Sequence, residues 1–212
     1  MFQFPVFAPT DAVSSRWNGA VRPLVASKPS HGGASACLTE VIPLLSLGLM
    51  LAADLPEGRL GTLGIELPEP LPPFGQYVPA IVHGTQLWVG GHFGTHPDGS
   101  LMVGRCGEDV SVELARLAAR SAALNLLSTV RSALGSLDEV RQVTQIFGVV
   151  NATPEFSDHT SVIDAASDLL VEVFGDAGRH TRLAVGVASL PANLVLEIQA
   201  HCIICPQGDR PT

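Results

Sequence analysis

Residues 180–204 have the sequence HTRLAVGVASLPANLVLEIQAHCII, and this stretch carries most of the information about the fold. Two runs rich in Val, Leu and Ile, residues 181–189 and 194–204, are separated by a short segment with Pro and Asn, which predicts two β-strands. In the second run, apolar side chains alternate with polar ones such as Glu197, so one face is apolar and the other is polar. We therefore expect a sheet that is covered on one side only.

The short segment between these two strands predicts that they pair as a hairpin. A symmetric turn would place Gly186 opposite Glu197 and Arg182 opposite His201, so that Arg182 and Glu197 would share the polar face. An arginine among alanines and glycines has little packing purpose, and its forked guanidinium suits a carboxylate ligand. Glu197 could orient or deprotonate a water. The alternative is an ion pair between Arg182 and Glu197 of neighbouring subunits.

The preceding segments predict three more strands and two helices. Asp109 or Ser111 can cap the first helix and Gly135 can end it, while Ser161 resembles a capping box at the second and Gly175 ends that helix. The order β-β-α-β-α-β-β predicts an α+β fold, with one mixed sheet and two helices on a single face. The segments are strands at 77–82 and 86–93, a helix at 111–134, a strand at 140–150 and a helix at 161–174.

The composition limits the partners of the chain. There are 12 Lys and Arg against 20 Asp and Glu, a formal net charge of -8, and no basic run, so we expect no nucleic-acid partner. Only 15% of the residues are charged, whereas 46% are hydrophobic. Because so few charges would cover a monomer poorly, we expect part of the apolar surface to be buried between subunits.

Several kinds of chemistry are disfavoured by the residues present. Lys28 is the only lysine, so a domain that starts after residue 50 cannot form a lysine Schiff base. Cys202 and Cys205 would face opposite sides of a strand, and no helix aligns His92 with His96, so we expect no metal. No phosphate-binding glycine loop and no Gly-x-Ser-x-Gly motif occurs, which disfavours nucleophile-based hydrolysis. The scattered cysteines favour a cytoplasmic location.

The domain boundaries follow from a change in composition. Residues 1–56 lack any sustained period and are assigned to an N-terminal extension, followed by a domain at 57–205 and a tail at 206–212. The longest apolar run has about thirteen residues, whereas a spanning helix needs ~20, so we expect no membrane partner. A chain that began at Met50 would lose most of this extension. The extension could be non-native or disordered, a peripheral ordered arm, or a targeting or anchoring segment.

Several short motifs follow one another along the predicted domain. They are GQYVPA at 75–80, LWVGG at 87–91, ALNLL at 123–127, SLDEV at 136–140, HTRLAV at 180–185, Leu190-Pro191 and Leu196-Glu197-Ile198. These motifs resemble those of the Rid (YjgF) family. The resemblance covers about residues 60–205, and its specificity comes from the order and spacing of the motifs together.

This resemblance implies a chorismate-mutase-like, homotrimeric protein with active sites in the clefts between subunits. It also implies hydrolytic deamination of reactive enamines and imines, such as 2-aminoacrylate, to 2-oxo acids and ammonia, without a cofactor. Arg182 matches the arginine that grips the substrate carboxylate, Glu197 the glutamate near the attacking water, and Tyr77 a tyrosine of the first strand. The further residues that we expect to bind substrate are Gly91, His92 and Ser167.

Two expectations refine this function. In the hairpin register Arg182 lies four residues from the position opposite Glu197, roughly 13 Å at ~3.3 Å per residue. We therefore expect the Arg182 and the Glu197 that serve one substrate to belong to different subunits, or Glu197 to act through a water. Departures from the family pattern, such as Gln199, make a substrate larger than 2-aminoacrylate plausible. The alternative function is a non-catalytic trimeric protein that binds small carboxylates or has a regulatory role. A third function, that of a ribonuclease or translation inhibitor, is attached to relatives of the family and is disfavoured by the acidic charge and the lack of a basic patch.

Overall fold

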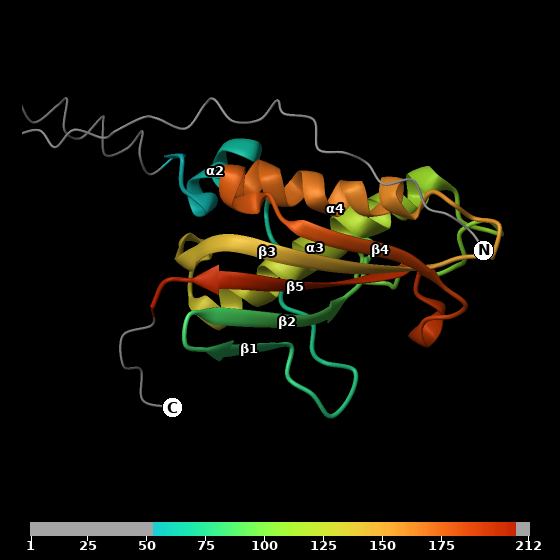
Figure 1. Ribbon diagram of the computed structural model, residues 1–212, viewed down its shortest axis with the longest axis horizontal. Coiled ribbons are helices and arrows are strands. Elements are labelled where there is room, and N and C mark those ends of the chain that lie inside the picture. Colours follow the sequence, from blue (N-terminus) through green and yellow to red (C-terminus); the bar gives the residue numbers. More distant parts are fainter. Residues whose placement is uncertain (1–52, 207–212) are drawn as a thin grey trace, which may run out of the picture. The chain divides into compact units, whose positions relative to one another are not determined.

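The computed structural model describes residues 53–206 of the chain, and Figure 1 shows their arrangement. Predictions for residues 1–52 and 207–212 lie outside this part. None of the helices within it has the length and apolar character needed to cross a membrane. The elements are α2 (Pro56–Leu63), β1 (Ala80–His83), β2 (Gln86–His92), α3 (Val112–Leu134), η1 (Leu137–Glu139), β3 (Val140–Asn151), α4 (His159–Phe174), η2 (Gly175–Gly178), β4 (Thr181–Val187), η3 (Pro191–Asn193) and β5 (Leu196–Ile204).

The five strands form one mixed sheet in the order β1-β2-β5-β3-β4. Strands β3 and β4 are parallel, and the other neighbouring pairs are antiparallel. In Figure 1 the strands run across the view with α3 crossing behind them. Both long helices cover this one face, which confirms the predicted α+β fold and leaves the opposite face of the sheet open.

The predicted hairpin between the last two strands is wrong. Strands β4 and β5 pair with opposite sides of β3, so they are not neighbours. Arg182 lies opposite Ile146 of β3, and Glu197 lies opposite Val149, three residues further along that strand. Because side chains alternate along a strand, positions an odd number apart face opposite sides. Arg182 therefore projects toward the helices and Glu197 toward the open face, so the prediction that they share a face is also wrong.

The path of the chain explains this arrangement. A strand that lies parallel to its neighbour needs a crossover connection, and α4 provides it between β3 and β4. The connection at 188–195 then passes the end of β3, where the N–H of Asn151 donates to the carbonyl of Val195 at 2.9 Å. Strand β5 can thus enter between β2 and β3, which a tight hairpin would forbid.

The capping predictions succeed at both ends of α3 and at the end of α4, where Gly175 is the C-cap, and they fail at the start of α4. The hydroxyl of Ser111 accepts a hydrogen bond from the N–H of Leu114 at 3.2 Å, and Gly135 ends α3 with φ 87°. Helix α4 begins before Ser161 and follows Asp158, whose side chain makes no capping hydrogen bond. The capping-box prediction at Ser161 is therefore wrong.

The core lies between the two long helices and the covered face of the sheet. Small side chains let α3 approach the sheet closely. At Gly94, a Cβ atom would lie 2.6 Å from the carbonyl oxygen of Ala118, so the backbone of the 93–95 segment touches the helix backbone. The fully buried alanines of α3 are Ala115, Ala118, Ala119, Ala122 and Ala123.

We expect Gly94→Ala to lower the free energy of unfolding by about 1–3 kcal/mol, because the added methyl group meets backbone that cannot rotate away. The urea midpoint of unfolding measures this change. Gly61→Ala in α2 is the matched control, since a methyl group added there would have nothing within 4 Å. The control should be neutral or stabilising by about 0.5–1 kcal/mol. Equal midpoints for the two variants would contradict the close approach.

Helix α2 was not expected from the sequence. Pro56 stands in its first turn, and Gly64 ends it with φ 64°. The carboxylate of Glu57 accepts hydrogen bonds from Arg131 Nε and Nη2, at 3.0 and 2.6 Å, and from the N–H of Leu137 at 2.9 Å. These contacts fasten the helix to the end of α3 and to η1, so α2 is part of the folded domain.

Candidate functional site

Glu197 stands in the middle of the open face, on β5. Its carboxylate has no hydrogen bond or ion pair with any residue between 53 and 206, and burial raises its pKa above the ordinary value. Gly91 on β2 makes room for it, since a Cβ atom at that position would lie 3.1 Å from Glu197 Oε2. A half-buried carboxylate of this kind can accept a proton closer to neutral pH than an exposed one.

Arg182 stands on β4 and points toward α4. Its Nη1 donates to Asp164 Oδ1 at 2.7 Å and to Ser167 Oγ at 2.9 Å. The Arg182 side chain is 19% exposed. Both bonds use Nη1, so Nε and Nη2 have no partner among the described residues. The guanidinium therefore retains a pair of donors that could grip a carboxylate.

Ser167 and His180 extend this network. Ser167 Oγ lies 3.0 Å from His180 Nε2, and His180 Nδ1 lies 2.6 Å from the carbonyl oxygen of Gly178. Burial lowers the pKa of His180; the bond to Gly178 opposes this effect and the charge of Arg182 adds to it. The sequence predicts no role for His180, because no spacing rule pairs a residue of α4 with one that precedes β4.

A cavity of about 330 Å³ opens beside the network. Its lining holds the guanidinium groups of Arg179 and Arg182 and no carboxylate. Asp176 and Asp164, the acidic partners of these two arginines, are not part of the lining. The cavity therefore suits an anionic ligand. The lining residues are Ser167, Val171, Arg179, His180 and Arg182.

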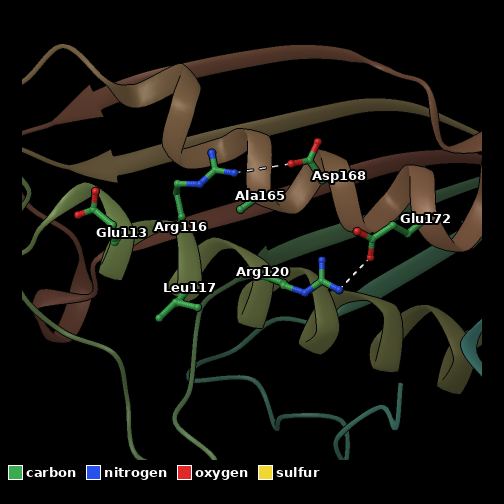
Figure 2. Close-up of a pocket in the computed structure, with 7 residues that line it drawn as sticks. All are labelled: Glu113, Arg116, Leu117, Arg120, Ala165, Asp168 and Glu172. Atoms are coloured by element: carbon green, nitrogen blue, oxygen red, sulfur yellow. Dashed lines mark hydrogen bonds and ion pairs between the residues drawn. The ribbon is translucent and has the colours of Figure 1, made fainter. Parts of the chain in front are cut away.

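A second cavity, of about 400 Å³, lies between α3 and α4. Figure 2 shows Arg116 facing Asp168 and Arg120 facing Glu172 across it, with N–O distances of 3.7 and 2.8 Å. Glu113 adds a third carboxylate to the lining. Three carboxylates against two guanidinium groups make this groove less suited to an anionic substrate than the cavity beside Arg182.

Tyr77 lies before β1, which corrects the expectation that it stands on the first strand. Its phenolic oxygen accepts a hydrogen bond from the N–H of Phe74 at 3.1 Å. Tyr77, Gly91 and His92 line one small hollow, and Gly91 also borders Glu197. The predicted site residues thus fall into two groups in one protomer. Tyr77, Gly91, His92 and Glu197 form the first, and Arg182 and Ser167 the second.

His92, a predicted substrate-binding residue, is buried on the covered side of β2 and is 4% exposed. Its Nε2 lies 2.7 Å from Thr129 Oγ1, and its Nδ1 lies 2.9 Å from the carbonyl oxygen of Gly90. Burial lowers its pKa, although the bond to Gly90 opposes the effect. Both ring nitrogens are engaged within the protein, and these bonds hold the irregular end of β2 against α3, while His92 also lines the hollow that Tyr77 and Gly91 share.

Two of the thiols, those of Cys106 and Cys202, are poorly suited to catalysis. Burial raises the pKa of Cys202 to about 12, and burial together with the charge of Asp109 raises that of Cys106 to about 11. The reactive thiolate is therefore scarce at neutral pH. In the part of the chain that the structure describes, no three His, Cys, Asp or Glu side chains gather as metal ligands would.

The fold and the two residue groups define an α+β protein with a five-stranded sheet, one open face and an unpartnered carboxylate upon it. Residues 57–204 match the model of the family described as "YjgF/chorismate_mutase-like, putative endoribonuclease". The chain belongs to this YjgF/chorismate-mutase-like family, which confirms the resemblance found in its sequence motifs.

Individual relatives support the same conclusion. The protein TCP17 of Trypanosoma cruzi is 38% identical over 152 residues, which is 71% of this chain and 95% of TCP17. A crystal structure of an endoribonuclease, named as putative, from Shewanella oneidensis MR-1 has 34% identity and a TM-score of 0.68, and covers 71% of this chain and 99% of that one. Atu1372 of Agrobacterium tumefaciens, whose function is unknown, has 39% identity and a TM-score of 0.67, with 76% and 99% covered.

Proposed function

We propose that this protein hydrolyses reactive enamines and imines of small carboxylic acids. With 2-aminoacrylate, a proton moves to the methylene carbon to form the imine, water adds to the C=N carbon, and the C–N bond breaks to release ammonia and pyruvate. A protonated C=N group is already electrophilic, so the protein needs only to hold the carboxylate, present a water and accept a proton.

Glu197 carries the proposal. It is half-buried, it has no partner among residues 53–206, and its pKa is raised by burial. In the proposed reaction its carboxylate takes a proton from the attacking water.

Arg182 would hold the substrate carboxylate, and this requires a second protomer. In one chain Arg182 and Glu197 face opposite sides of the sheet, so one small substrate cannot reach both. The open face has apolar side chains that a second copy would cover, since Ile81, Leu183 and Ile203 are 54%, 49% and 44% exposed. We infer that the site forms between subunits of a homotrimer.

The test is to generate 2-aminoacrylate with a pyridoxal-dependent dehydratase and to follow pyruvate formation. The wild-type protein should accelerate hydrolysis above the uncatalysed rate. Arg182→Ala should lower kcat/KM by about 10–100-fold, because charge-assisted hydrogen bonds to the substrate are lost. Arg120→Ala, which removes an arginine of the groove between α3 and α4, is the control and should leave the rate unchanged.

The alternative function is a trimeric protein that binds small carboxylates without turnover. One observation favours it: Asp164 already occupies one side of the Arg182 guanidinium. Absence of acceleration, together with saturable 2-oxo-acid binding in calorimetry, would support this alternative over the deaminase.

A further inference from the structure

We propose that Ser167 is a nucleophile activated by His180, and that it attacks small esters bearing a carboxylate in the cavity beside Arg182. This inference does not depend on the deamination reaction. It requires no group from a second protomer, because all of its parts lie on α4, on η2, on residues 179–180 that follow it, and at the start of β4.

The geometry is that of a serine with a base and an orienting group. Ser167 Oγ lies 3.0 Å from His180 Nε2, and Gly178 O lies 2.6 Å from His180 Nδ1. A carbonyl can only accept, so Nδ1 carries the proton and Nε2 is left to accept from the Ser167 hydroxyl. A nucleophile in reach of a base that a third group orients is the arrangement that activates serine for covalent catalysis.

Arg182 strengthens this activation. Its Nη1 donates to Ser167 Oγ at 2.9 Å, which favours the alkoxide that forms as the proton leaves. Burial lowers the pKa of His180, so the imidazole is neutral and able to accept a proton at pH 7. The hydroxyl thus lies between a positive donor and a neutral acceptor.

The cavity indicates the class of substrate. Its volume of about 330 Å³ suits a small molecule, and Val171 provides an apolar wall. Arg179 and Arg182 line the same cavity and would bind a carboxylate carried by the ester. A half-ester of a short dicarboxylic acid meets these requirements.

The reaction proceeds in two balanced steps. Ser167 Oγ bonds to the ester carbonyl carbon while its proton passes to His180 Nε2, and the C–O bond to the alcohol breaks as that proton moves to the leaving oxygen. Water then attacks the acyl-serine, gives a proton to Nε2, and releases the acid while Ser167 Oγ regains the proton.

The experiment treats the full-length protein with a fluorophosphonate probe and maps the modified residue by mass spectrometry. One phosphonyl group should be found on Ser167, and Ser167→Ala should remove it. His180→Asn should slow labelling by about 10²-fold or more, since the base is lost. Ser121→Ala is the matched control: this helical serine bonds to the backbone of Thr95 and has no histidine partner, so its loss should leave labelling unchanged.

A second measurement tests the substrate class. The 4-nitrophenyl half-ester of succinate should react with a kcat/KM about tenfold above that of 4-nitrophenyl acetate, because only the former carries a carboxylate. Failure to label the folded wild-type protein, labelling at another residue, or an unchanged rate in His180→Asn would each overturn the proposal. None of these outcomes alters the pyruvate assay, so failure of this inference and failure of the proposed function remain distinguishable.

Discussion

Glu197→Gln is expected to lower kcat/KM for 2-aminoacrylate hydrolysis by about 10²–10⁴-fold, because the amide cannot accept the proton of the attacking water. The substitution keeps the size of the side chain and removes only its basicity. Pyruvate formation coupled to lactate dehydrogenase measures the rate. Gln199→Ala, two residues along the same face of β5, is the control and should stay close to the wild-type rate. Unaltered turnover in Glu197→Gln would remove Glu197 from the mechanism.

The pH dependence provides a second readout for the same substitution. Burial raises the pKa of Glu197, and the base acts only when ionised, so wild-type kcat/KM should rise with pH through this raised pKa. The rise should be absent from the residual activity of Glu197→Gln. If kcat/KM rose with pH in the same way in the wild type and in Glu197→Gln, the group that titrates would be a residue other than Glu197.

Stability should change in the opposite direction from activity. The folded state holds the Glu197 proton more tightly than the unfolded state, so this contribution to stability is present below the unfolded pKa and is lost as pH rises through the folded pKa. At pH 7 Glu197→Gln should therefore unfold at a higher urea concentration than the wild type. The difference should vanish in acid, where both side chains are neutral.

Mixed trimers should recover activity that neither parent variant possesses. If each site takes Arg182 from one protomer and Glu197 from the next, a trimer containing both Arg182→Ala and Glu197→Gln protomers has one site with both native residues. Co-expressed variants with different tags, purified through both tags, should then show about one third of wild-type activity.

The control for this experiment pairs Arg182→Ala with the double variant, which cannot assemble a complete site. No activity should return in that mixture. Inactive mixed trimers of verified composition would show that the two residues do not serve one substrate. A particle of another size in light scattering would exclude the trimer itself.

Much of the fold is predictable because it depends on local periodicity and on capping. The alternation in 194–204 separates buried Leu196 and Ile198 from Glu197, as observed. The cap at Ser111 and the stop at Gly135 are local hydrogen-bond and backbone effects, so they too follow from neighbouring residues. The role expected of Arg182 came from the resemblance of the motifs to a family. Periodicity alone did not decide between binding of a carboxylate ligand and an ion pair between subunits.

The errors arise where distant segments meet. The short segment between the last two strands led to the prediction of a hairpin. Whether two strands pair depends on the order of strands in the sheet, and this order depends on the whole path of the chain through α4. The resemblance to the family implies that His92 binds substrate, but it does not show the irregularity in β2 between Val89 and His92 or the bonds of the ring to Thr129 and Gly90. The partner of His180 on α4 likewise has no signature in the sequence.

The sequence by itself determined the approximate place of the two long helices and the five strands, which face of the last strand is apolar, and which family the motifs resemble, because these properties depend on residues a few positions apart. Only the tertiary structure decided that Arg182 bonds to Asp164 and Ser167 while Glu197 stands alone on the opposite face. The physical reason is that strand order sets which side chains become neighbours. That order follows from how the helices and strands bury their apolar surfaces together, and short-range spacing does not encode it.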